Sequence, residues 1–182
     1  MSNVKQPLRL LALSLTAASV LVSAPMVSAT TVASVKPAPS VTAAFEGRLI
    51  GLADGWGEAR ACTSDGVATR CYRSEEAMDV AENVALDVTA AATLACSGSL
   101  RLYRLSGFGG GVLQLTTQFT VINLASYGFD NDTSSYRVGP CNSSFYDTTT
   151  GGTGYPGNTS ANVSATSMVS GWDNRVGSVY IS

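Results

Sequence analysis

Two short stretches of the sequence repeat one spacing of residue types. Residues 128–135 read GFDNDTSS and residues 171–178 read GWDNRVGS. Each stretch places a glycine, an aromatic residue, an aspartate, an asparagine and a final serine at matching offsets, and each runs into a short segment rich in apolar residues. A polar loop that leads into such a segment is typical of a β-strand entry. The repetition predicts a structural duplication, a paired ion site, or both.

The chain around these stretches has the pattern of a β-domain. Residues 99–104 and 112–116 alternate between apolar and polar side chains, with a glycine-rich turn at 107–111 between them. Residues 119–122 and 135–138 form two further short strands in this interpretation, and the remaining sequence repeats the arrangement more loosely. Four strands with a glycine hairpin between the first two predict a Greek key.

The start of the sequence predicts export. Two basic residues precede a short apolar run, and Val-Ser-Ala at 27–29 offers a cleavage site, so we interpret residues 1–29 as a secretory signal peptide. Residues 30–44 are rich in Ala, Val, Ser, Thr and Pro, which indicates a disordered linker. We therefore expect a secreted, extracellular protein without a membrane span.

Residues 45–95 predict a hairpin followed by one helix. Turn signals occur at 54–55 (Asp-Gly) and at 64–66 (Ser-Asp-Gly). Ser74 is a good helix cap, and apolar residues recur at spacings of three and four from about 75 to 91. We assign the two adjacent glutamates at the start of this helix to capping rather than to acid–base chemistry.

The cysteines predict two disulfides. The chain has 4 cysteines and no histidine, and in an exported protein an even count favours disulfides over a zinc site. Three connectivities are possible, and we favour Cys62–Cys71, which would close the hairpin, with Cys96–Cys141.

Residues 96–182 resemble the βγ-crystallin family. Tyr103, Phe108 and Gly110 match that family's signature of an aromatic residue, four residues, a second aromatic residue, any residue and glycine. Residues 130–135, DNDTSS, match its Asp/Asn-Asp/Asn-x-x-Ser/Thr-Ser element at every position. The resemblance implies a mainly β, double Greek-key sandwich, which here is preceded by the disulfide-closed hairpin and the helix.

The second repeat departs from the family pattern. Tyr155 and Gly157 offer the aromatic-x-glycine step, but Tyr146 lies too far before them, and Ser170 stands where the family has a tyrosine. Gly177 replaces the hydroxyl-bearing ligand of the loop. The resemblance therefore implies one intact and one degraded site, and serine at position 177 is expected to strengthen the degraded one.

The polar loops are suited to calcium, a hard cation that binds six to eight oxygen atoms. In the family each site is completed by both repeats. The ligands that the resemblance implies are the Ser134 hydroxyl, the backbone carbonyls of Asp132 and Arg175, and the side-chain oxygens of Asp130, Asn131, Asp173 and Asn174. The same short polar side chains could instead only hydrogen-bond their own turns. If calcium binds, we expect modest affinity.

Several function classes are excluded or kept as alternatives. The net charge of −2 without a basic run argues against nucleic acid and anionic membranes, and the lack of histidine excludes a Ser-His-Asp triad. We expect a non-enzymatic, monomeric protein whose partner is the calcium ion. One alternative is a metalloproteinase inhibitor that presents the Gly/Thr-rich segment 148–165 to an extracellular protease. Another is a cell-envelope structural protein without an ion.

Overall fold

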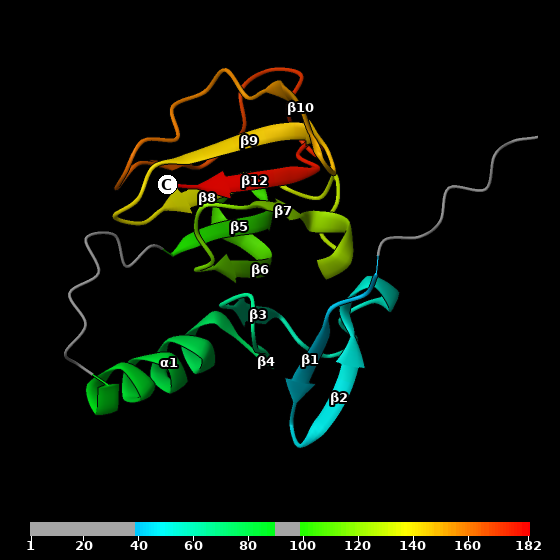
Figure 1. Ribbon diagram of the computed structural model, residues 1–182, viewed down its shortest axis with the longest axis vertical. Coiled ribbons are helices and arrows are strands. Elements are labelled where there is room, and N and C mark those ends of the chain that lie inside the picture. Colours follow the sequence, from blue (N-terminus) through cyan, green and yellow to red (C-terminus); the bar gives the residue numbers. More distant parts are fainter. Residues whose placement is uncertain (1–38, 90–98) are drawn as a thin grey trace, which may run out of the picture. The chain divides into compact units, whose positions relative to one another are not determined.

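The computed structural model describes residues 39–89 and 99–182, whose strands form an eight-stranded and a four-stranded sheet (Figure 1). The first sheet has the order β11-β8-β5-β6-β3-β4-β1-β2 and the second the order β10-β9-β12-β7. The elements are β1 (Thr42–Phe45), β2 (Arg48–Gly51), β3 (Ala61–Ser64), β4 (Thr69–Tyr72), α1 (Glu75–Thr89), β5 (Leu100–Leu105), β6 (Gly109–Leu115), β7 (Val121–Asn123), β8 (Ser135–Val138), β9 (Ser143–Thr148), β10 (Gly151–Gly154), β11 (Ser164–Ala165) and β12 (Ser178–Ile181).

The strand order shows that the fold is duplicated. Half of the larger sheet runs β11-β8-β5-β6, and the smaller sheet runs β7-β12-β9-β10. Strands β5 to β8 of one repeat therefore correspond to β9 to β12 of the other. The third strand of each repeat, β7 or β11, pairs with the fourth strand of the opposite repeat. This arrangement confirms the expected double Greek-key sandwich.

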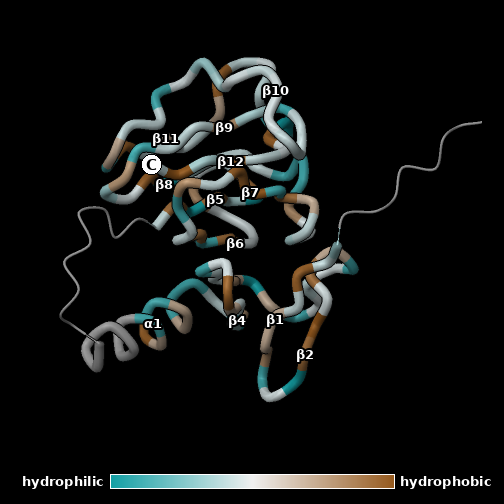
Figure 2. The backbone as a smooth tube through the Cα atoms, viewed as in Figure 1, coloured by the Kyte–Doolittle hydropathy of each residue, from teal (hydrophilic) through white to brown (hydrophobic). Residues whose placement is uncertain are grey.

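The core lies between the two sheets. Leu102 and Leu113 from the larger sheet are fully buried in one cluster with Phe145 and Val179 from the smaller one. Figure 2 shows the apolar positions as short brown stretches separated by polar positions along the strands. This alternation follows from the two-residue period of a strand, in which only one face of each sheet meets the core.

The segment before the repeats extends the larger sheet instead of standing apart from it. Strand β3 pairs in parallel with β6, and β1 pairs in parallel with β4. Leu52 and Trp56 belong to the same core cluster as the repeats. The boundary expected at residue 96 therefore does not separate two cores. Strand β1 begins at Thr42, so ordered structure also starts inside the linker expected over residues 30–44.

The expected hairpin disulfide is present. Cys62 and Cys71 lie directly opposite each other on β3 and β4 and are bonded. Cys141 is buried and is not a free thiol, while its predicted partner Cys96 lies outside the described residues. The expected signal peptide also lies outside them, as does the linker up to residue 38.

The expected helix is α1, which begins at Glu75 as predicted. The Ser74 hydroxyl accepts a hydrogen bond from the Ala77 amide at 3.1 Å and so caps the helix. Met78 is fully buried in a small cluster with Tyr103 and Val112 of the larger sheet. Helix α1 is described to Thr89, short of the predicted end at residue 91. In the described part of the chain, no helix is long and apolar enough to cross a membrane.

Candidate functional site

The two polar loops bind each other through matching backbone hydrogen bonds. The Asn131 amide donates to the Val176 carbonyl at 3.0 Å, and the Asn174 amide donates to the Thr133 carbonyl at 3.0 Å. Asn131 and Asn174 adopt left-handed backbone conformations, with φ of 54° and 53°, which asparagine tolerates better than most residues. The loops therefore form one structural unit with approximate two-fold symmetry.

This unit brings two predicted ligands together from different repeats. The Ser134 Oγ atom lies 3.3 Å from the Asn174 Oδ1 atom and donates a hydrogen bond to it. Ser134 is buried, whereas Asn174 is exposed, so the two oxygen atoms meet at the edge of the protein surface. Within residues 39–89 and 99–182, no hydrogen bond is made to the Asp132 backbone carbonyl. A cation at this point would find oxygen donors from both loops.

The remaining predicted ligands lie at the rim of the loops. Asp130 and Asp173 are exposed, and no described residue makes a hydrogen bond or ion pair with either carboxylate. Although the residue is exposed, neighbouring atoms partly desolvate the Asp130 carboxyl and raise its pKa above the usual value, as expected for a carboxylate without a cationic partner. Among the described residues, no group of three His, Cys, Asp or Glu side chains could hold a metal ion. Any ion here would depend on Asn, Ser and backbone oxygens, which suit calcium better than a transition metal.

In the second of the two predicted calcium sites, the position of the hydroxyl ligand is packed against backbone. Gly177 occupies the position that corresponds to Ser134, and its amide and carbonyl bond to the Tyr146 carbonyl and the Leu124 amide. A Cβ atom at Gly177 would lie 2.6 Å from the Thr148 carbonyl carbon. The expectation that serine at 177 would simply strengthen this site is therefore wrong, because the neighbouring backbone leaves no room for its side chain.

The last serine of each motif has a structural role. The Ser135 hydroxyl donates to the Leu105 carbonyl at 2.6 Å and accepts from the Phe108 amide at 3.1 Å. These bonds hold the turn between β5 and β6 against β8. Phe108 has φ of 62°, and its ring packs edge-on against Tyr103 with centroids 5.4 Å apart. The predicted signature of Tyr103, Phe108 and Gly110 thus corresponds to the hairpin formed by β5 and β6.

Ser178 makes the corresponding bonds in the second repeat. Its hydroxyl donates to the Thr148 carbonyl at 2.6 Å and accepts from the Gly151 amide at 3.1 Å. Gly151 therefore takes the place of Phe108, and the second hairpin has no aromatic residue at that point. The alternative match at Tyr155 and Gly157 is wrong, because both residues follow β10.

An ion pair lies beside the first loop. The Arg104 guanidinium pairs with the Asp132 carboxylate and donates to the Gly128 carbonyl at 2.9 Å. It lies over the rings of Trp56 and Phe129, 4.7 Å and 4.6 Å from their centroids. Burial lowers the pKa of Arg104 from its usual value. The alternation of residues along β5 gives no sign of this contact, because the covering residue, Trp56, comes from a distant segment.

An open pocket adjoins this ion pair. It has a volume of about 780 Å³. Arg104, Asp132 and Asn174 line one part of it, and residues between β2 and β3 line another. The segment before the repeats therefore contributes to the surroundings of the candidate ion site.

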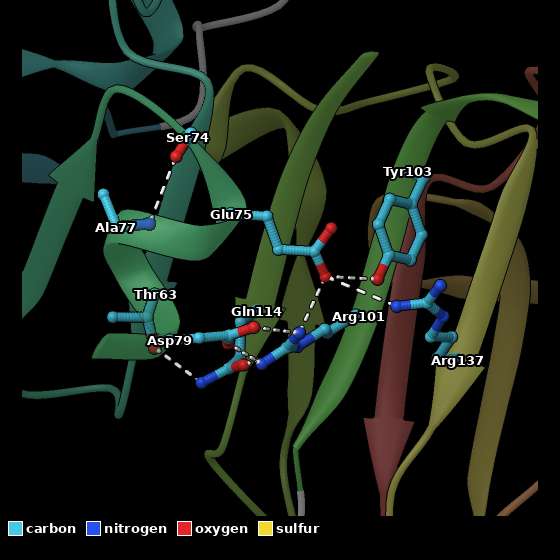
Figure 3. Close-up of polar contacts among 9 residues, drawn as sticks. All are labelled: Thr63, Ser74, Glu75, Ala77, Asp79, Arg101, Tyr103, Gln114 and Arg137. Carbon is cyan, nitrogen blue, oxygen red and sulfur yellow. Dashed lines mark hydrogen bonds and ion pairs between the residues drawn. The ribbon is translucent and has the colours of Figure 1, made fainter. Parts of the chain in front are cut away.

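The outer face of the larger sheet carries a second polar cluster, which binds helix α1 (Figure 3). Glu75 accepts from Arg101 and from the Tyr103 hydroxyl, each at 2.7 Å, and Arg137 lies 3.6 Å away. Asp79 also pairs with Arg101. Burial, together with the bond to Glu75, raises the pKa of Tyr103. All of these charges are paired across the helix–sheet contact, so we assign the cluster to helix docking.

In the segment 148–165, the Tyr155 side chain is half-buried. The ring packs within 6 Å of three other aromatic rings, with centroid distances of 5.9, 5.7 and 5.3 Å to Tyr136, Phe145 and Trp172. Its hydroxyl accepts from the Val169 amide at 3.2 Å. Tyr155 therefore anchors this segment to the core.

Comparison with known proteins gives three matches among solved structures. One is a βγ-crystallin from an archaeon, with 18% identity and a TM-score of 0.37, over 48% of this chain and 100% of that domain. The N-terminal domain of Protein S has 20% identity and a TM-score of 0.38, over 46% and 94%. A βγ-crystallin domain from Flavobacterium johnsoniae has 20% identity and a TM-score of 0.35, over 46% and 92%. No protein-family model and no curated protein matches the sequence.

Proposed function

We propose that this protein is a secreted, non-enzymatic calcium-binding module of the βγ-crystallin type, in which one bound ion stabilises the fold. The observation that carries the proposal is the approach of the Ser134 and Asn174 oxygen atoms to 3.3 Å across the two repeats. A cation bound there would link the loops and would favour the folded state, because the two donors separate on unfolding.

The donor set favours calcium over other cations. Ser134 and Asn174 offer a hydroxyl and an amide oxygen, Asp132 offers its backbone carbonyl, and Asp130 offers a carboxylate that no described residue engages. All are hard oxygen donors, and water would complete the six to eight positions that calcium requires. Because few of them carry charge, we expect an affinity in the range of extracellular modules, on the order of 10⁻⁴ to 10⁻³ M.

The second site is proposed to be inactive. It has no hydroxyl at position 177, and the Asp147 carboxylate on the neighbouring strand is paired with the Arg175 guanidinium at 3.0 Å. The Arg175 carbonyl and the Asn131 side chain would then have no further oxygen donors with which to hold an ion. We therefore propose a stoichiometry of one calcium ion per chain.

Export is supported by two features. The apolar N-terminal run with its Val-Ser-Ala site has the pattern of a signal peptide. The Cys62–Cys71 disulfide fits an oxidising compartment. The calcium concentration outside cells would suit a site of modest affinity.

The test is a calorimetric calcium titration of the purified protein, with melting curves in EDTA and in calcium. We expect saturable binding of one ion and a higher melting temperature in calcium. Ser134→Ala should abolish binding, and the matched control Ser126→Ala, at a serine outside the motif, should not change it. If the wild-type protein shows neither heat nor a thermal shift, the loops are structural turns and the proposal is wrong.

A further inference from the structure

Each loop of the candidate site is closed by an ion pair, and the charges of the two pairs are reversed. In the first repeat, Arg104 near the end of β5 pairs with Asp132 in the loop. In the second, Asp147 near the end of β9 pairs with Arg175 in the loop at 3.0 Å. The positions correspond, since β5 and β9 are equivalent strands and Asp132 and Arg175 are the fifth residues of the stretches 128–135 and 171–178. The duplication has thus kept the pair while exchanging its charges.

The exchange puts a fixed positive charge beside the loop that retains its hydroxyl ligand. Arg104, Asp132 and Asn174 line the same pocket, and Asn174 contacts Ser134. In the other repeat the residue on the strand is an aspartate, but it lies beside the loop whose ligand position is Gly177. On the strands, the negative charge therefore lies beside the degraded site and the positive charge beside the intact one, while the charges in the two loops have the opposite signs.

Arg104 is held in this position by the segment before the repeats. Its guanidinium lies over the rings of Trp56 and Phe129, which pack against each other with centroids 5.5 Å apart, and the Trp56 indole donates to the Tyr127 carbonyl at 2.8 Å. The side chain of Arg104 is 29% exposed. A guanidinium fixed on two aromatic faces and a backbone carbonyl cannot swing away from an arriving ion as a free surface arginine can.

On the basis of the proposed function, we propose that Arg104 is an affinity-determining residue that weakens calcium binding at the intact site. It does so by neutralising the Asp132 carboxylate and by repelling the ion directly. The effect depends on the segment before the repeats, because Trp56 in that segment fixes the Arg104 guanidinium in place. The protein would then respond to high extracellular calcium rather than to traces of it.

The test compares the calcium affinity of three variants with that of the wild type by calorimetry. Arg104→Gln should bind calcium roughly five- to tenfold more tightly, the order that Coulomb's law gives for removing a unit charge a few ångströms from a divalent ion in a partly screened site. The gain should shrink as salt is raised, because screening weakens the interaction. Arg48→Gln is the control for net charge, since Arg48 is exposed and has no ion pair with a described residue; we expect its affinity to equal that of the wild type.

The double variant Arg104→Gln/Asp132→Asn covers the case in which the single variant does not fold. It keeps the net charge of the wild type and leaves no unpaired carboxylate, and its affinity should lie within about threefold of the wild type. Tenfold weaker binding by the folded double variant would show that the Asp132 carboxylate matters and Arg104 does not, and would overturn the inference.

The outcomes separate this inference from the proposed function. If the wild type binds calcium and Arg104→Gln binds no more tightly, the role of Arg104 is refuted and the calcium site stands. If Arg104→Gln binds and the wild type does not, Arg104 suppresses the site completely and the proposed function of the wild type fails. If neither folded protein binds, both ideas are overturned.

Discussion

Replacing Gly177 by alanine or serine places a Cβ atom against the backbone of Thr148. The added atom would lie 2.6 Å from the carbonyl carbon and 3.0 Å from both the Cα and the carbonyl oxygen. Gly177 cannot withdraw, because its amide bonds to Tyr146 at 2.8 Å and its carbonyl accepts from Leu124 at 3.0 Å. Backbone atoms on both sides would have to move.

Overpacking of this kind costs roughly 1–3 kcal/mol in unfolding free energy. For a domain of this size the loss corresponds to a decrease in melting temperature of roughly 3–12 °C. Gly177→Ala isolates the steric effect, and Gly177→Ser adds the hydroxyl that a calcium ligand would need. We expect both variants to lose the same stability in EDTA, and serine to gain no measurable calcium affinity.

Thermal melting followed by circular dichroism, with and without calcium, measures these effects. Gly154→Ala is the matched control, because Gly154 is exposed and a Cβ atom there meets no other atom within 4 Å; its melting temperature should not change. If Gly177→Ser has the same melting temperature as the wild type and binds a second calcium ion, the packing argument is refuted and the second loop has room for a ligand.

Three further predictions concern the same fold. Ser135→Ala and Ser178→Ala should each lose roughly 1–3 kcal/mol in chemical denaturation, because each leaves a carbonyl and an amide without their partner; a loss in only one of them would contradict the structural equivalence of the repeats. Two backbone amides of its own turn lower the pKa of Asp65, so wild type should be more stable than Asp65→Asn above about pH 4, and the difference should fade as the pH falls through the lowered value. Denaturation at several pH values tests this, and a difference that does not shrink on acidification would contradict it. Replacing Cys62 and Cys71 by alanine should cost about 2–3 kcal/mol, and an unchanged melting temperature would show that the hairpin is held by its sheet pairing alone.

The sequence predicted those features whose signals are local. The loops with their final serines, the hairpin closed by Cys62 and Cys71, and the start of α1 at Ser74 all follow from residues close together in the chain. The strands of the first repeat follow from the alternation of apolar residues. Each of these predictions depended on turn chemistry or periodicity, which act over a few residues.

The features that were missed depend on distant partners. The parallel pairing of β3 with β6 has no local signal, so the extension of the larger sheet could not be read from the sequence. Arg104 has the pattern of an exposed strand residue until Trp56 covers it. Gly177 has the pattern of a lost ligand, and only the position of Thr148 shows that the backbone requires a glycine there.

The exchange of β7 and β11 between the two sheets has a consequence for the origin of the protein. Without β7 the smaller sheet lacks an edge strand, and without β11 the larger one does. One repeat synthesised alone would therefore expose an incomplete sheet, which a second copy of the same repeat would complete. The two-fold relation between the loops fits descent from a symmetric homodimer. Its gene would have been duplicated and the two copies fused, after which each half became free to change. In this view the reversed charges of the two ion pairs and the glycine at 177 are differences that only a fused, asymmetric pair could acquire.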